Sequence, residues 1–145
     1  MASVSPRPWS ELWRLARPGA RVYLAGATGE PTAALDALAA EPELGRDLRL
    51  TGVWLPGVNR RDPTAGVPGA SADVFFVTPE LREGFAAGRV RHLPLHYSDT
   101  HRWLAGPAGL DLAILRVSPP VDGHVTPGLS CDFLPALLAS GAALV

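Results

Sequence analysis

The sequence predicts an α/β fold built on an open, largely parallel sheet flanked by helices. Short runs of β-branched, aromatic and aliphatic residues are typical of buried strands. These runs alternate with short segments of helical apolar periodicity, and that order favours parallel strands joined by helical crossovers. Turn-forming residues separate the segments, with 15 glycines and 15 prolines in 145 residues. Together these observations predict a single layered domain.

The first half of the chain predicts one short helix and then two strands with a second helix between them. A capping serine, Ser10, and a terminating Pro-Gly pair bound the first helix. Proline in a first turn marks the start of the second helix, whose apolar face carries leucines. The segments are a helix at 11–16, a strand at 21–26, a helix from Pro31 and a strand at 48–55.

A long aperiodic loop at residues 57–72 opens the second half, and loops of this length are often functional. Pro94 restricts its strand to a sheet edge or a strand end, Gly88 is typical of a helix end, and Pro135 fits a first turn or a kink. The segments are a strand at 73–77, a helix from Pro79, a strand at 91–97, a helix at 99–104, a strand at 111–117, a helix at 132–140 and the start of a strand at 142–145.

Composition narrows the function classes. A net charge of -1 gives no basic field for a nucleic acid or an anionic membrane, so neither partner is expected. All 13 basic residues are arginine, which excludes a lysine Schiff base and a P-loop lysine. The lone Cys131 excludes an internal disulfide and favours the cytoplasm. Without 18 consecutive apolar residues, no membrane span is predicted.

Two loops are candidates for ligand binding because each follows a predicted strand. In open α/β sheets, ligands bind at the carboxyl ends of strands. The loop after the first strand lacks the GxGxxG and Walker patterns, so an ordinary strand–helix turn remains an alternative. The loops are Gly26-Ala27-Thr28-Gly29 after the first strand, and Ser118-Pro119-Pro120 with Gly128-Leu129-Ser130 after the strand at 111–117.

The remaining histidine, serine, cysteine and aspartate side chains are assigned no catalytic or metal-binding role. On a strand at 91–97, His92 and His96 would share a face about 13 Å apart, too far for one metal ion, and no metal site is expected. Ser118 and Ser130 lie among turn formers and are interpreted as turn-stabilising. Cys131 is interpreted as a small packed residue. The acidic pair Asp122 and Asp132 receives no paired-carboxylate role.

A succession of motifs over residues 8–145 resembles the N-terminal domain of the acetyl-CoA hydrolase/transferase family, which includes acetate and 4-hydroxybutyrate CoA-transferases. The Val-Ser-Pro-Pro segment with the following Gly and Ser-x-Asp is the most specific part. The motifs are Leu-Pro-Gly-Val-Asn-Arg-Arg-Asp at 55–62, His-Leu-Pro-Leu-His-Tyr-Ser-Asp at 92–99, Val-Ser-Pro-Pro-Val-Asp-Gly-His at 117–124 and Gly-Leu-Ser-Cys-Asp at 128–132.

The resemblance implies transfer of CoA from an acyl-CoA to a small carboxylate, or hydrolysis of the thioester, through a glutamate nucleophile. In the family this glutamate belongs to the C-terminal domain, so no glutamate of this sequence is assigned as catalytic. CoA is expected as a substrate, with no metal or prosthetic group. The implied partners are acyl-CoA, a small carboxylate and the missing C-terminal domain or a complementary subunit, with a homo-oligomer left open.

From the resemblance we expect a helical lead-in at 1–20 and a family N-terminal domain at 21–145, truncated before the catalytic domain. Residues 142–145 would then begin a strand with an exposed apolar edge. The alternatives are a non-catalytic CoA-binding or subunit-pairing remnant, an enzyme whose second half is another subunit, and a generic nucleotide-binding domain. The expected substrate-pocket residues are Gly26, Ala27, Thr28, Gly29, Ser118, Pro119, Gly128 and Ser130.

Overall fold

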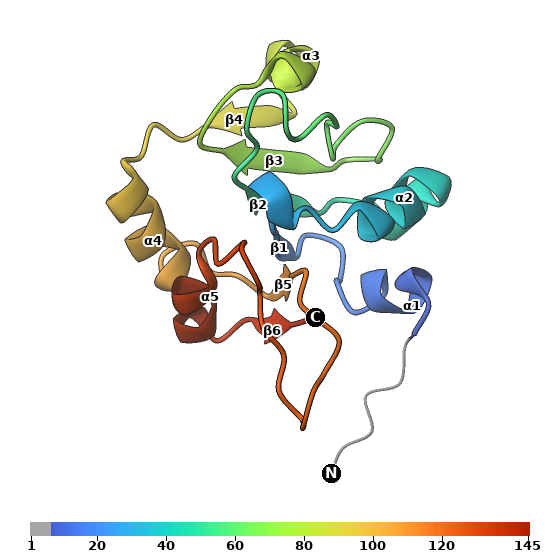
Figure 1. Ribbon diagram of the computed structural model, residues 1–145. Coiled ribbons are helices and arrows are strands. Elements are labelled where there is room, and N and C mark those ends of the chain that lie inside the picture. The colour runs from blue at the N-terminus through green and yellow to red at the C-terminus, as the bar shows by residue number, and fades with distance from the viewer. Residues whose placement is uncertain (1–6) are drawn as a thin grey trace.

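Six parallel strands form one open sheet in the computed structural model, which describes residues 7–145 (Figure 1). The strand order is β4-β3-β2-β1-β5-β6, and every neighbouring pair is parallel. The predicted α/β fold with a parallel sheet is therefore confirmed. The strands are β1 (Arg21–Leu24), β2 (Arg49–Gly52), β3 (Ser71–Val74), β4 (Val90–His92), β5 (Leu112–Ile114) and β6 (Ala143–Leu144).

Short helices connect and flank these strands. Several of them begin with proline in the first turn, as at Pro42, Pro79 and Pro135, where the missing N–H costs no helical hydrogen bond. The helices are α1 (Trp9–Trp13), α2 (Thr32–Ala40), α3 (Arg82–Ala86), α4 (Tyr97–Ala105) and α5 (Leu134–Ser140), with 3-10 turns η1 (Ala27–Gly29), η2 (Pro42–Gly45) and η3 (Pro79–Leu81).

The strand order reverses direction between β1 and β5. From β1 the chain adds β2, β3 and β4 on one side, then returns to place β5 and β6 on the other side. Val22 pairs with Leu112 and Leu24 with Ile114 across this junction. Open α/β sheets bind ligands in the crevice beyond the carboxyl ends of the strands at such a reversal. The segments that follow β1 and β5 are therefore the place to look for a site.

Alternate residues of the central strands feed two apolar cores on opposite faces of the sheet. Val22 and Leu24 belong to the core with α1 and α2, whereas Tyr23 belongs to the core with α4 and α5. Figure 1 shows these two pairs of helices on opposite sides of the sheet. Fully buried aromatic side chains, Trp13 in the first core and Phe133 in the second, fill the space between sheet and helices. Burial of each such side chain stabilises the fold by about 2–3 kcal/mol.

The predicted lead-in at residues 1–20 takes part in the first core, although its residues 1–6 lie outside the described residues. Helix α1 buries Trp13 completely, and the indole Nε1–H donates to the Ala34 carbonyl of α2 at 2.9 Å. This bond satisfies the buried donor and fixes α1 on α2. Pro8, and not Ser10, precedes the first residue of α1, so the helix begins and ends earlier than the predicted 11–16.

The strand predictions were too long at the carboxyl ends. The strand expected at 73–77 runs from Ser71 to Val74, and those expected at 48–55 and 111–117 keep their ladders only over β2 and β5. Leu93 N–H donates to the Val74 carbonyl at 2.8 Å, which is the last bond between β3 and β4 before the chain turns away. Apolar residues continue past the paired part of each strand because they pack under the edge loops. Their sequence pattern is the same as that of a strand, so the predicted strands extended too far.

The strand expected at 91–97 contracts to Val90–His92, and α4 begins at Tyr97 instead of residue 99. His92 and His96 therefore do not share a strand, and the premise of the separation estimate was wrong. Pro94 follows the end of an edge strand, as its missing N–H requires, which confirms that prediction. The helix expected at 132–140 starts at Leu134, and β6 confirms a strand within residues 142–145.

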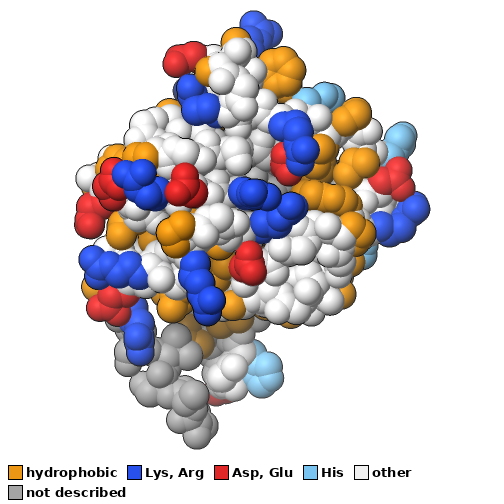
Figure 2. All heavy atoms as spheres, turned by 180° about the vertical axis from the view of Figure 1, so that it is seen from behind, with side chains coloured by type: hydrophobic (Ala, Val, Ile, Leu, Met, Phe, Trp, Pro, Cys, Tyr) orange, Lys and Arg blue, Asp and Glu red, His pale blue; other side chains and the backbone are white. Residues whose placement is uncertain are grey.

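Arginine and acidic side chains are interspersed on the face of the molecule opposite to the view of Figure 1 (Figure 2). One surface ion pair of the molecule joins Arg91 Nε to Asp73 at 2.7 Å. Surface pairs of this kind contribute little to stability but neutralise local charge. Among the described residues, no helix is both long and apolar enough to cross a membrane.

Candidate functional site

A hollow of about 590 Å³ lies beyond the carboxyl ends of β1 and β5, where the strand order reverses. We call it the carboxyl-edge hollow. One wall follows β1 and the other follows β5, so segments about 90 residues apart in the sequence meet here. Its lining residues are Thr28, Gly29, Arg116, Val117, Ser118, Pro119, Thr126, Pro127, Gly128, Leu129 and Ser130.

Six of the eight predicted pocket residues line this hollow, namely Thr28, Gly29, Ser118, Pro119, Gly128 and Ser130. The other two, Gly26 and Ala27, lie at the base of the first wall and do not line it. Ala27 N–H donates to the Val53 carbonyl at 3.0 Å, which ties this base to the end of β2. The structure thus brings the two predicted loops together around one space. Their contact with a substrate stays a prediction.

Two glycines allow the first wall to pack closely on its neighbours. A Cβ on Gly26 would lie 1.8 Å from the carbonyl oxygen of Val53, and a Cβ on Gly29 would lie 2.6 Å from Ser130 Oγ. The first obstacle is backbone, which cannot move aside, whereas the second is the end of a small side chain. Glycine is therefore needed at position 26 for the fold, and at position 29 for the approach of one wall to the other.

A buried asparagine from the long loop holds the first wall in place. Asn59 is 1% exposed. Its Oδ1 accepts from Leu55 N–H at 2.9 Å, and its Nδ2 donates to the Ala27 carbonyl at 3.0 Å and to the Glu30 carboxylate. These bonds satisfy the buried amide and connect the β2 loop to η1. The long loop, singled out by its length, thus supports the site from beneath and does not line it.

The second wall is a projecting arm, residues 116–130, which leaves β5 and returns to α5 (Figure 1). Ser118 fastens the two sides of the arm: its N–H donates to the Thr126 carbonyl at 2.8 Å, and its Oγ accepts from Thr126 N–H at 3.1 Å. These bonds give Ser118 a structural contact across the arm, between residues eight positions apart. Val121 and Leu129 of the arm are strongly exposed, at 69% and 105%.

A hydrogen-bonded tyrosine–aspartate pair lies behind the second wall, with Tyr23 buried and Asp132 half-buried. The Tyr23 hydroxyl at the end of β1 donates to the Asp132 carboxylate, which belongs to the segment between the arm and α5. Burial raises the pKa of Asp132, although the Tyr23 hydrogen bond and the Gly26 amide both act to lower it. Burial, and then the Asp132 charge, raise the pKa of Tyr23 well above its usual range. Tyr23 therefore stays protonated and remains a donor.

Sequence reasoning missed Arg116 and Asp132. Of the eleven described residues that line the hollow, Arg116 is the charged one. Its signal was its position, at the carboxyl end of the strand expected at 111–117. Asp132 was considered only as half of a pair with Asp122, which is exposed on the arm. Its true partner, Tyr23, is 109 residues away, and no local pattern indicates that contact.

Histidine and cysteine side chains do not gather at this site. Within residues 7–145, no three His, Cys, Asp or Glu side chains are arranged to hold a metal ion. His92 lies near the Phe75 carbonyl at 3.3 Å, and His124 lies on the arm near the Asp122 carbonyl at 2.9 Å. Cys131 is exposed, so its interpretation as a packed residue was wrong.

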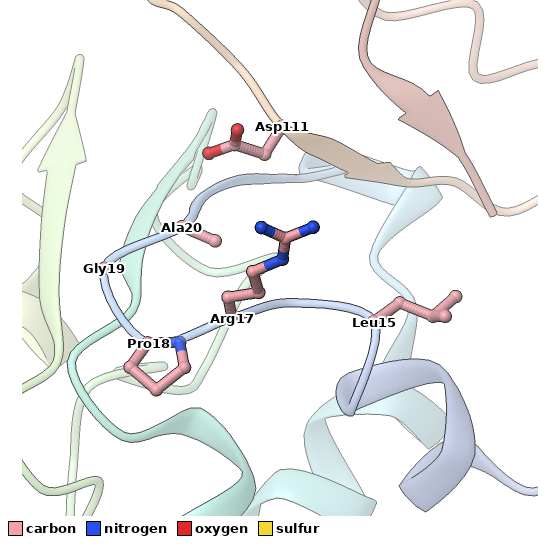
Figure 3. Close-up of a pocket in the computed structure, with 6 residues that line it drawn as sticks. All are labelled: Leu15, Arg17, Pro18, Gly19, Ala20 and Asp111. Carbon is pink, nitrogen blue, oxygen red and sulfur yellow. The ribbon is translucent and has the colours of Figure 1, made fainter.

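A second hollow, of about 490 Å³, lies at the opposite, amino-terminal end of the sheet. We call it the amino-edge hollow. Figure 3 shows the Arg17 guanidinium pointing into it beside Asp111. The Asp111 carboxylate accepts from Arg21 N–H at 2.8 Å and so caps the junction of β1 and β5. Its other lining residues are Leu15, Pro18, Gly19 and Ala20.

The acetyl-CoA hydrolase/transferase N-terminal domain model matches residues 7–145, which is nearly the whole chain. The chain belongs to this family. The match includes both walls of the carboxyl-edge hollow and confirms the resemblance that the motifs indicated. No curated protein is similar enough to this family member to count as a match.

Solved structures of RipA share the fold of this acetyl-CoA hydrolase/transferase domain. RipA from Yersinia pestis is 22% identical with a TM-score of 0.75, and the match covers 95% of this chain and 35% of RipA. Two substituted forms of RipA give TM-scores of 0.74 and 0.71 at 21% and 23% identity, covering 93% and 91% of this chain and 34% and 32% of theirs. The chain thus spans about a third of the length of these structures.

Proposed function

We propose that this chain is the N-terminal part of an acyl-CoA:carboxylate CoA-transferase or acetyl-CoA hydrolase that moves CoA between a thioester and an acetate-type carboxylate. The observation that carries the proposal is the carboxyl-edge hollow, formed by the two segments that follow β1 and β5 at the reversal of strand order. That position is where open α/β sheets bind their ligands. Family membership supplies the ligand class.

In this proposal the chain binds and encloses the substrate, and a glutamate of the C-terminal domain attacks the thioester. Transfer through an acyl–glutamate intermediate requires that water be excluded. The exposed apolar side chains of the arm suit coverage by the C-terminal domain or a complementary subunit, since they would close the hollow from the solvent side. Acyl-CoA and a small carboxylate are the substrates, and no prosthetic group takes part. These side chains are Val117, Val121, Val125 and Leu129.

The presence of Arg116 in the lining of the hollow favours a negatively charged substrate. CoA carries phosphate groups and the acceptor is a carboxylate, so both substrates are negatively charged. A guanidinium binds either group through charge-assisted hydrogen bonds in a planar fork. Arg116 lies two residues after the end of β5, so the sheet holds its backbone close to the hollow.

Acetyl-CoA binding and thiol release test the proposal together. Acetyl-CoA titrated into the chain should bind in isothermal calorimetry. The chain alone should release no thiol from acetyl-CoA when thiols are followed with DTNB, and addition of the C-terminal domain of a family member should produce release. Cys131 is exposed and itself reacts with DTNB, so the assay uses Cys131→Ser. Steady release by that variant alone, in proportion to its concentration, would place the nucleophile in this chain.

The alternative is a non-catalytic remnant that binds CoA or pairs with an intact subunit. The exposed arm and the exposed edge strand β6 favour it, because both surfaces suit a partner whether or not chemistry follows. The result expected for this alternative is that the chain binds acetyl-CoA, or forms a stable complex with a family C-terminal domain, and that no thiol is released. Release in the complex would rule it out.

A further inference from the structure

Asp132 joins two parts of the chain that build the carboxyl-edge hollow. It follows the wall that Ser130 contributes, and it does not line the hollow itself. Its carboxylate accepts from the Tyr23 hydroxyl of β1, the strand that leads into the first wall. A single side chain thus connects the second wall with the central strand.

The backbone at Asp132 is also fixed in an uncommon conformation. Its φ of 38° lies in the left-handed region, which residues other than glycine seldom adopt. Such a conformation persists where surrounding contacts determine it. The next residue, Phe133, is 1% exposed, and its ring packs against Tyr97 of α4 with the ring centroids 4.6 Å apart. The chain between the arm and α5 is therefore held at two successive residues.

The position of this segment determines how closely the two walls approach. Gly29 and Ser130 lie close together: a Cβ on the glycine would lie 2.6 Å from Ser130 Oγ and 3.3 Å from its Cβ, so Ser130 would have to shift. A small displacement of the segment around Asp132 would move Ser130 and change the width of the hollow. Catalytic and binding sites are sensitive to displacements of this size.

We propose that Asp132 is the positioning residue of the carboxyl-edge hollow, where its carboxylate ties the second wall to Tyr23, in the strand that leads into the first wall. The inference rests on the proposed function for the identity of the ligand, but the tie between the walls does not depend on the ligand. The side chain acts through Ser130 and the arm, and it touches no substrate.

A purely structural residue at this position would not need to be a carboxylate. Asp132 is half-buried, and even partial removal of a carboxylate from water costs free energy unless hydrogen bonds satisfy it. Well-packed apolar residues stabilise a core at least as well. The titratable groups that face Asp132 are the hydroxyls of Tyr23 on β1 and Tyr97 on α4. Neither carries a positive charge, so the carboxylate is retained for its directed hydrogen bonds.

The lone cysteine provides a direct measurement of the tie. Cys131 is exposed and precedes Asp132, so a nitroxide label on it reports the mobility of this segment by electron paramagnetic resonance. In Tyr23→Phe, which keeps the ring and removes the donor, we expect the rotational correlation time of the label to fall at least twofold. Asp132→Ala should lower the correlation time to a similar extent. Asp132→Asn keeps an acceptor for Tyr23, so its label should have nearly the same correlation time as in the unsubstituted chain.

Asp111→Ala is the matched control, because it removes another carboxylate that accepts a hydrogen bond, at the opposite end of the sheet. It should leave the label unchanged even where it lowers the unfolding temperature. Acetyl-CoA should bind at least about tenfold more weakly to Tyr23→Phe and Asp132→Ala, and with unchanged affinity to Asp111→Ala. This separates a positioning role from a general loss of stability.

The outcomes distinguish the inference from the proposed function. A label equally immobile in every variant would overturn the tie. A mobile label with unchanged acetyl-CoA affinity would overturn its role in positioning the hollow. Acetyl-CoA that fails to bind the unsubstituted chain would contradict the proposed function, while label mobility would still decide whether Asp132 holds the walls together.

Discussion

The two ends of the sheet carry hollows of similar size that differ in construction. The carboxyl-edge hollow, about 590 Å³, is built from two loops that approach closely at Gly29 and Ser130; Asn59 holds the first loop and Asp132 holds the second. The amino-edge hollow, about 490 Å³, lies under the lead-in turn, and its Asp111 serves the junction of β1 and β5. Volume therefore does not identify a site. The number of independent contacts that fix its walls is more informative.

The largest expected contrast between the two ends concerns glycine. Gly26→Ala should lower the free energy of unfolding by about 4 kcal/mol or more, because the new Cβ meets the Val53 carbonyl. Gly19→Ala, at the amino edge, meets no atom within 4 Å, and its positive φ of 83° costs about 1–2 kcal/mol. Urea unfolding of both variants measures the difference. Equal losses would show that the first wall is looser than described.

A second contrast concerns the two arginines. Arg116→Gln should weaken acetyl-CoA binding about tenfold, because it removes the charged donor of the carboxyl-edge hollow. Arg17→Gln, in the amino-edge hollow, should leave the affinity within about twofold (Figure 3). Calorimetric titration of the two variants measures both values. The reverse result would move the ligand to the opposite end of the sheet.

The smallest expected effect is a pH dependence specific to the carboxyl edge. Burial raises the pKa of Asp132 in the folded chain. Above about pH 4, the usual pKa of an aspartate, the carboxyl group therefore stays protonated to a higher pH in the folded state than in the unfolded state. The free energy of unfolding should fall as pH rises through this window, and Asp132→Asn should remove that component. Urea unfolding at several pH values measures this. The midpoint of Asp132→Asn minus the midpoint of the unsubstituted chain should increase with pH and then become constant. Parallel curves would mean that Asp132 is solvated.

The sequence predicted the sheet well because each strand and turn carries its own local signal. Parallel pairing, the edge position of Pro94 and the first-turn proline of α5 follow from backbone geometry that single residues impose. Strand ends were less predictable, since Phe75 is buried in the second core although it lies past the end of β3. A buried residue looks the same in the sequence whether or not its backbone is paired.

The site was predictable to the extent that it follows from topology. The loops after β1 and β5 could be chosen because strands end there, and six of the eight chosen residues do line the hollow. The Tyr23–Asp132 and Asn59–Ala27 contacts join residues 109 and 32 positions apart, and nothing local specifies either one. Loops can thus be located from a single sequence, but the side chains that hold them together cannot.

The pairing of β1 with β5 also has a kinetic consequence. About 90 residues separate these neighbouring strands, so their contact closes a long loop, whereas β1, β2 and β3 join over shorter distances. Long-range contacts of this kind slow folding, because chain entropy is lost before the contact forms. The hollow does not exist until that step is complete. A ligand that bridges both walls would accordingly bind the native state alone and stabilise it, which makes ligand binding a reporter of this long-range contact.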